Sequence, residues 1–107
     1  MAACIETLFV AVQKARLREP SASRTAKLMR DGTVKIAKKL AEEAVEVGHE
    51  AILKHRDATI EESADLLYNL VVLWADAGIN PADVWDEMER RRMMMGLAEK
   101  LPKAANR

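Results

Sequence analysis

The sequence predicts an all-α protein, a helical bundle built around a central antiparallel hairpin of two long helices and completed by dimerisation. Apolar residues recur at helical spacing, and no segment shows the alternation of a strand. Only four glycines and three prolines interrupt the 107 residues. We expect one domain over residues 1–107, with a flexible tail over about residues 97–107. Because so short a chain buries little surface alone, we expect a homodimer, or a higher oligomer.

The first helix is predicted over about residues 3–18. Its apolar residues Ile5, Leu8, Phe9 and Val12 lie at i, i+3, i+4 and i+7, as one face of a helix requires. A break with Pro20 follows. A short helix is then predicted over residues 24–31, ending at the Asp31-Gly32 pair.

Two long helices are predicted over about residues 33–54 and 59–77. A turn at Arg56 and Asp57 joins them, and the short connection makes the two helices antiparallel neighbours. The second helix should end at Gly78, a residue type favoured just after a helix C-terminus.

The last helix is predicted to begin at Asn80-Pro81, with Asn80 as the N-cap and Pro81 as the first helical residue. It should extend at least to Met93.

Composition excludes several classes of protein. Seventeen basic and seventeen acidic residues give no net charge, so we expect no nucleic-acid partner. The single cysteine excludes an internal disulfide and a multi-cysteine zinc site. No apolar run reaches 18 residues, so we expect no membrane span. The N-terminus lacks the basic start of a signal peptide, which favours a cytoplasmic location.

The acids of the segment KKLAEEAVEVGHE (residues 38–50) are not spread evenly around the helix. At about 100° per residue, Glu43 and Glu50 lie at the border of an apolar stripe, while Glu42 points furthest from it. The stripe consists of Ile36, Leu40, Ala44, Val47 and Ala51.

The next helix repeats the arrangement, with Glu62, Asp65 and Asn69 bordering its own apolar stripe. If the two stripes pack together, carboxylates from both helices meet at a shared edge. Half-buried charges of one sign are costly, and a divalent cation would neutralise them. Mg²⁺ fits because it prefers carboxylate oxygens and keeps waters for a phosphate substrate. The alternative is an ordinary solvated acidic face.

The spacing Glu43-x-x-Glu46 followed by Glu62-x-x-Asp65 resembles the signature of the all-α, MazG-like nucleoside-triphosphate pyrophosphohydrolases. GTVKIAKKLAEEAVEV, EESADLLYNL and SRTAKL are closer to one branch, the phosphoribosyl-ATP pyrophosphatases of histidine biosynthesis. Asn69 departs from the branch, which usually has His at this position.

The resemblance implies hydrolysis of the α–β phosphoanhydride of phosphoribosyl-ATP to phosphoribosyl-AMP and pyrophosphate. Mg²⁺ would be held by Glu43, Glu46, Glu62 and Asp65, and Glu43 or Glu46 would act as general base. The candidate substrate-binding residues are Ser23, Thr25, Lys35, Lys39, Asn69 and Arg91.

Several alternatives stay open. One alternative function is that of a MazG-like housecleaning (d)NTP pyrophosphatase, and another is that of a catalytically inactive helical dimerisation module. Ser23 or Thr25 could be an N-cap, and Lys39 could simply form an ion pair. Glu50 either joins the metal site or lies beside it.

Overall fold

The computed structural model describes residues 2–98 and, within them, the side chains of residues 3–95. This part of the chain folds into five α-helices without a strand, so the predicted fold class is confirmed. The helices are α1 (Ala2–Ala15), α2 (Arg24–Asp31), α3 (Thr33–Ile52), α4 (Arg56–Ala77) and α5 (Pro81–Ala98). The predicted flexible tail lies, from residue 99 on, outside the described residues. None of the described helices is long and apolar enough to cross a membrane.

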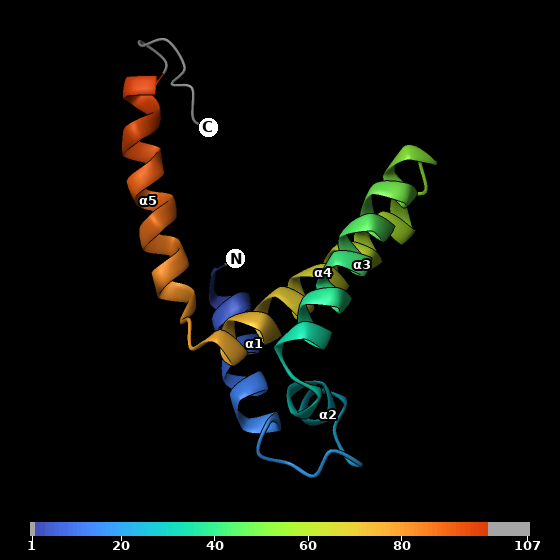
Figure 1. The fold of residues 1–107 in the computed structure, drawn as a ribbon. Coiled ribbons are helices and arrows are strands. Elements are labelled where there is room, and N and C mark those ends of the chain that lie inside the picture. Colours follow the sequence, from blue (N-terminus) through green and yellow to red (C-terminus); the bar gives the residue numbers. More distant parts are fainter. Residues whose placement is uncertain (1, 99–107) are drawn as a thin grey trace.

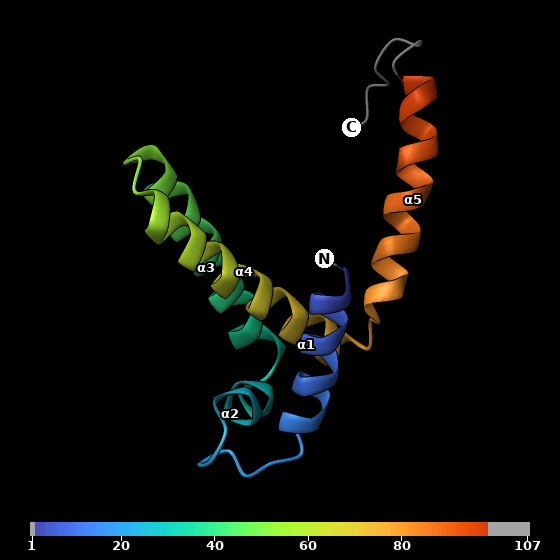
Figure 2. The ribbon, with the colours of Figure 1, turned by 180° about the vertical axis from the view of Figure 1, so that it is seen from behind.

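Helices α3 and α4 form the predicted antiparallel hairpin and lie side by side in both views (Figures 1 and 2). Helix α1 crosses α4 near the base of the hairpin, and α2 lies below the start of α3. Helix α5 leaves this base in another direction and stays apart from the hairpin. The Cα radius of gyration is 16.6 Å, whereas a compact domain of this size has about 13 Å. One chain alone is therefore an open shape.

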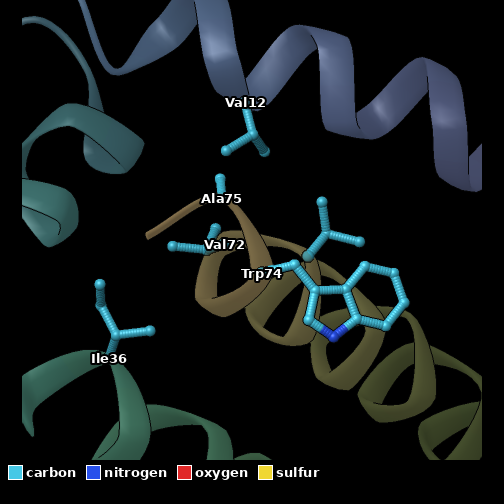
Figure 3. Packing of buried hydrophobic residues seen from close by; sticks show 6 residues of the cluster. Val12, Ile36, Val72, Trp74 and Ala75 are labelled. Atoms are coloured by element: carbon cyan, nitrogen blue, oxygen red, sulfur yellow. The ribbon is translucent and has the colours of Figure 1, made fainter. Parts of the chain in front are cut away.

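The core lies where α1, α3 and α4 meet. Val12 of α1, Ile36 of α3 and Val72 and Ala75 of α4 are buried against one another (Figure 3). Trp74 adds the largest side chain and contacts the Trp85 ring edge-to-face, with centroids 6.1 Å apart. Among residues 2–98, no helix covers the far half of the hairpin in this way, so its apolar stripes are only partly buried.

The turn of the hairpin differs from the prediction. It comprises Leu53, Lys54 and His55, and α4 begins at Arg56, where we predicted the turn itself. Lys54 adopts a φ of 61°, the left-handed conformation that usually ends a helix. Thr59 lies within α4 and donates its hydroxyl to the carbonyl of His55 at 2.7 Å. The helix therefore starts about one turn earlier than predicted.

Two glycines and one asparagine set three further helix boundaries as predicted, whereas α1 ends at Ala15, before the predicted end at about residue 18. Gly32 alone separates α2 from α3 and has a φ of 99°, and Gly78 ends α4 with a φ of 73°. A side chain at either position would be strained. The Asn80 side chain accepts a hydrogen bond from the Ala82 amide at 2.9 Å, which caps α5.

Candidate metal and phosphate site

Three carboxylates converge on the edge between α3 and α4. Oxygens of Glu43, Glu62 and Asp65 all lie within 4.8 Å of one another. Glu62 and Asp65 share one face of α4 because they are three residues apart, and the antiparallel packing brings Glu43 of α3 opposite them. We call these three residues the acidic cluster. The predicted meeting of acids from both helices is therefore seen in the structure.

The electrostatics of the acidic cluster favour a cation. A hydrogen bond with Glu43 raises the pKa of Glu62, and partial burial and the charges of Glu43, Asp65 and Glu46 add to this rise. One oxygen of Glu43 is buried and has no hydrogen-bond partner in the part of the chain that the structure describes. An unpaired buried carboxylate oxygen is costly, and a divalent cation would satisfy it with the ligand type it prefers. The donor set therefore fits Mg²⁺.

Glu46 and Glu50 lie outside the acidic cluster. Glu46 is exposed one turn after Glu43, and its charge still acts on Glu62. Glu50 instead contacts His55, with 2.8 Å between a carboxylate oxygen and Nδ1. Of the four predicted metal ligands, three are thus brought together and Glu46 is adjacent.

The two predicted substrate-binding lysines lie on α3 before Glu43, and Lys39 is the nearer one to the acidic cluster. Nζ of Lys39 is 4.0 Å from a carboxylate oxygen of Glu43. Lys35 lies one turn earlier, and both lysines line a hollow of about 270 Å³ with Lys38 and Glu42. Lys39 therefore forms the ion pair and also faces a space that a phosphate could enter.

The hydroxyls of Ser23 and Thr25 make contacts within the protein. Ser23 Oγ accepts a hydrogen bond from the Ala26 amide at 3.1 Å and caps α2. The hydroxyls of Thr25 and Tyr68 share a hydrogen bond of 2.6 Å, which joins α2 to α4. These contacts position the first turn of α2 next to the acidic cluster.

Asn69 and Arg91 have different surroundings. Asn69 is 1% exposed and donates from Nδ2 to the Asp65 carbonyl at 2.8 Å, while its Oδ1 has no partner among the described residues. Arg91 is exposed on α5 and donates to Glu87 at 3.0 Å. Since α5 stays apart from the hairpin, Arg91 is not brought to the acidic cluster of its own chain (Figure 1).

Sequence reasoning missed Arg24 and Tyr68. Arg24 lies over the Tyr68 ring, 5.4 Å from its centroid, and both line a hollow of about 370 Å³ with Asp65. Tyr68 follows Asp65 by three residues and so shares its face of α4. That spacing was the available signal for Tyr68, whereas only the packing of α2 on α4 identifies Arg24.

Comparison with known proteins gives one consistent result. The family described as phosphoribosyl-ATP pyrophosphohydrolase matches residues 6–92. The chain is 57% identical over 105 residues to phosphoribosyl-ATP pyrophosphatase 2 of Bradyrhizobium diazoefficiens, covering 98% of this chain and 78% of that protein. It is 57% identical over 104 residues to the protein of that name from Rhodopseudomonas palustris, covering 97% and 79%. The phosphoribosyl-ATP pyrophosphatase of Azospirillum brasilense is 50% identical over 99 residues, covering 92% and 89%.

Proposed function

The chain belongs to the phosphoribosyl-ATP pyrophosphohydrolase family, and on that premise we propose that it hydrolyses the α–β phosphoanhydride of phosphoribosyl-ATP with Mg²⁺. The products are phosphoribosyl-AMP and pyrophosphate, as in the second step of histidine biosynthesis. The acidic cluster is the single observation that carries this proposal, because three carboxylates within 4.8 Å suit a cation that also binds phosphate oxygens.

Glu43, Glu62 and Asp65 would hold the ion. Glu46, on the adjacent turn of α3, would add its negative charge to theirs. Mg²⁺ bound there would withdraw charge from the phosphate oxygens of the substrate. We assign the general base to Glu46, since the other carboxylates serve as ligands and Glu46 is exposed beside them. Glu43 is the alternative base. Lys39 lies next to Glu43 and would bind a phosphate oxygen.

The protein acts as a homodimer in this proposal. A second apolar stripe, exposed to solvent, runs along α3 through Val34, Val45 and Ile52, and another runs along α4 through Ile60 and Leu67. Val45 and Ile52, like Ile60 and Leu67, are seven residues apart and so share one face of their helix. Exposed apolar stripes of this kind mark interaction surfaces, and two hairpins packed by them would form a four-helix bundle.

The substrate assignment is tested by measuring pyrophosphate release from phosphoribosyl-ATP and from a panel of dNTPs, with Mg²⁺ and with EDTA. We expect the highest kcat/KM for phosphoribosyl-ATP and no turnover in EDTA. Preference for a dNTP would support a housecleaning pyrophosphatase, and no turnover of any nucleotide would support an inactive module.

The dimer is tested by light scattering of the wild type and of a Val45→Glu, Leu67→Glu double variant. We expect twice the chain mass for the wild type and the mass of one chain for the variant. A monomeric wild type at working concentration would contradict the dimer without affecting the substrate assignment.

A further inference from the structure

A basic groove adjoins the acidic cluster on the side of α2. It comprises three hollows, two of which share Lys35 and Lys39, while Arg24 links the second to the third. The third hollow reaches Asp65 of the acidic cluster. The cations that line the basic groove are Arg24, Lys27, Lys35, Lys38 and Lys39.

The charge of the basic groove is only partly balanced. Lys27 pairs with Asp31 at 3.3 Å, and Lys39 approaches Glu43 at 4.0 Å. Within the described residues, the other three cations of the groove have no carboxylate oxygen within 4.0 Å. The basic groove therefore presents an excess of positive charge beside a strongly acidic cluster.

Arg24 is held in place by its surroundings. It begins α2, directly after the cap residue Ser23, and its guanidinium lies over the Tyr68 ring. The adjacent Thr25 shares its hydroxyl hydrogen bond with that same tyrosine. Because Tyr68 is on α4 one turn after Asp65, the position of Arg24 is fixed relative to the acidic cluster.

Resting on the proposed function, we propose that the basic groove binds the phosphomonoester of the substrate's phosphoribosyl group, while the acidic cluster binds the triphosphate. Lys35 lies eight residues before Glu43, which is about 12 Å along α3. That distance exceeds the span between the first and last phosphorus atoms of a triphosphate, so two separate anionic groups suit the site better than one.

The chemistry of the basic groove matches this ligand. A phosphomonoester carries nearly two negative charges at neutral pH. Arginine binds such a group through two parallel hydrogen bonds, and lysine adds a point charge. A dNTP has no phosphate group apart from its triphosphate, so the basic groove would select the phosphoribosyl nucleotide over it.

The test compares binding of phosphoribosyl-AMP, AMP and pyrophosphate, each with Mg²⁺, by calorimetry. We expect the wild type to bind phosphoribosyl-AMP more tightly than AMP. Arg24→Ala and Lys35→Ala should each weaken phosphoribosyl-AMP binding by about 10- to 100-fold and leave AMP and pyrophosphate nearly unchanged. Arg30→Ala is the matched control, because it removes an exposed cation of α2 that does not line the basic groove.

Each other outcome has a defined meaning. Equal affinity of the wild type for phosphoribosyl-AMP and AMP would overturn the inference, as would unchanged binding in both groove variants. If Arg24→Ala or Lys35→Ala weakened binding of AMP or pyrophosphate as much as binding of phosphoribosyl-AMP, the basic groove would bind the triphosphate of the substrate, and the inference would be wrong. If the wild type releases no pyrophosphate from phosphoribosyl-ATP, the proposed function fails by itself, whatever the binding data show. Helical CD of every variant verifies the fold.

Discussion

The Glu50 carboxylate lies 2.8 Å from Nδ1 of His55, across the turn that joins α3 to α4. This contact accounts for Glu50, which lies on the same border of α3 as Glu43. Glu50 has a partner at the turn and is not one of the three carboxylates that converge.

Because Glu50 lies outside the acidic cluster, we expect Glu50→Gln to keep kcat/KM for phosphoribosyl-ATP within about threefold of the wild type. A threefold loss corresponds to less than about 1 kcal/mol of transition-state stabilisation. Steady-state pyrophosphate release measures this directly. If Glu50→Gln lost activity as severely as Glu62→Gln, Glu50 would have to be counted among the metal ligands.

A second prediction concerns the stability of the metal-free protein. The hydrogen bond with Glu43, together with burial and neighbouring charges, raises the pKa of Glu62 in the folded state. A raised pKa means that the folded state binds the proton more tightly than the unfolded state. This contribution to stability is therefore fully present below the unfolded pKa and is lost as pH rises through the folded pKa.

Glu62→Gln should accordingly raise the melting temperature of EDTA-treated protein at pH 7–8, with a smaller effect at about pH 4.5. The same variant should lose catalysis, because its amide cannot replace the charge. Glu61→Gln is the control, since Glu61 is an exposed neighbour on α4 outside the acidic cluster. Equal melting temperatures for the two variants at pH 8 would show that charge repulsion between Glu62 and the neighbouring carboxylates does not destabilise the fold.

A third prediction concerns the link between α2 and α4. Tyr68→Phe keeps the ring under Arg24 but removes the hydroxyl bonded to Thr25. We expect a loss of about 1 kcal/mol in the free energy of unfolding, the typical net value of one hydrogen bond. Urea unfolding of Tyr68→Phe, Thr25→Ala and the double variant measures it. The double variant should be clearly less destabilised than the sum of the two single variants, so strict additivity would exclude the contact.

A fourth prediction concerns α5. Hydrogen bonds from Arg90 and Arg91 lower the pKa of Glu87 to about 2. A lowered pKa stabilises the fold above the unfolded pKa, and that contribution disappears as pH falls toward 2. An NMR titration of the Glu87 carboxyl should show this low midpoint, and Arg90→Ala with Arg91→Ala should restore an ordinary one. An ordinary midpoint in the wild type would show that solvent screens these exposed pairs.

The sequence was sufficient to predict the helices and the meeting of carboxylates at the edge between α3 and α4. Apolar residues at helical spacing located α1, α3 and α4, while the signals at Asp31-Gly32 and Asn80-Pro81 located α2 and α5. Gly32, Gly78 and Asn80 marked the boundaries where a special backbone conformation or a cap is needed. The two acidic pairs were found because three-residue spacing places both carboxylates on one face.

The rest depends on contacts between distant residues. The hairpin turn was misplaced because Asp57 and Thr59 resemble capping residues, whereas Lys54 ends α3 without the glycine that usually marks such a site. The burial of Asn69 was not predictable from its place at the border of the apolar stripe, because burial depends on which elements pack against α4. Likewise, only the packing of α2 on Tyr68 brings Arg24 toward Asp65.

The central claim is that the carboxylates between α3 and α4 perform Mg²⁺-dependent hydrolysis. Its most direct test is pyrophosphate release from phosphoribosyl-ATP by Glu43→Gln, Glu46→Gln, Glu62→Gln and Asp65→Asn, with Glu61→Gln as the matched control and helical CD as the check on folding. We predict that each of the four loses at least about a hundredfold in kcat, while Glu61→Gln stays near the wild type. Full activity in any two of the four variants would contradict the claim.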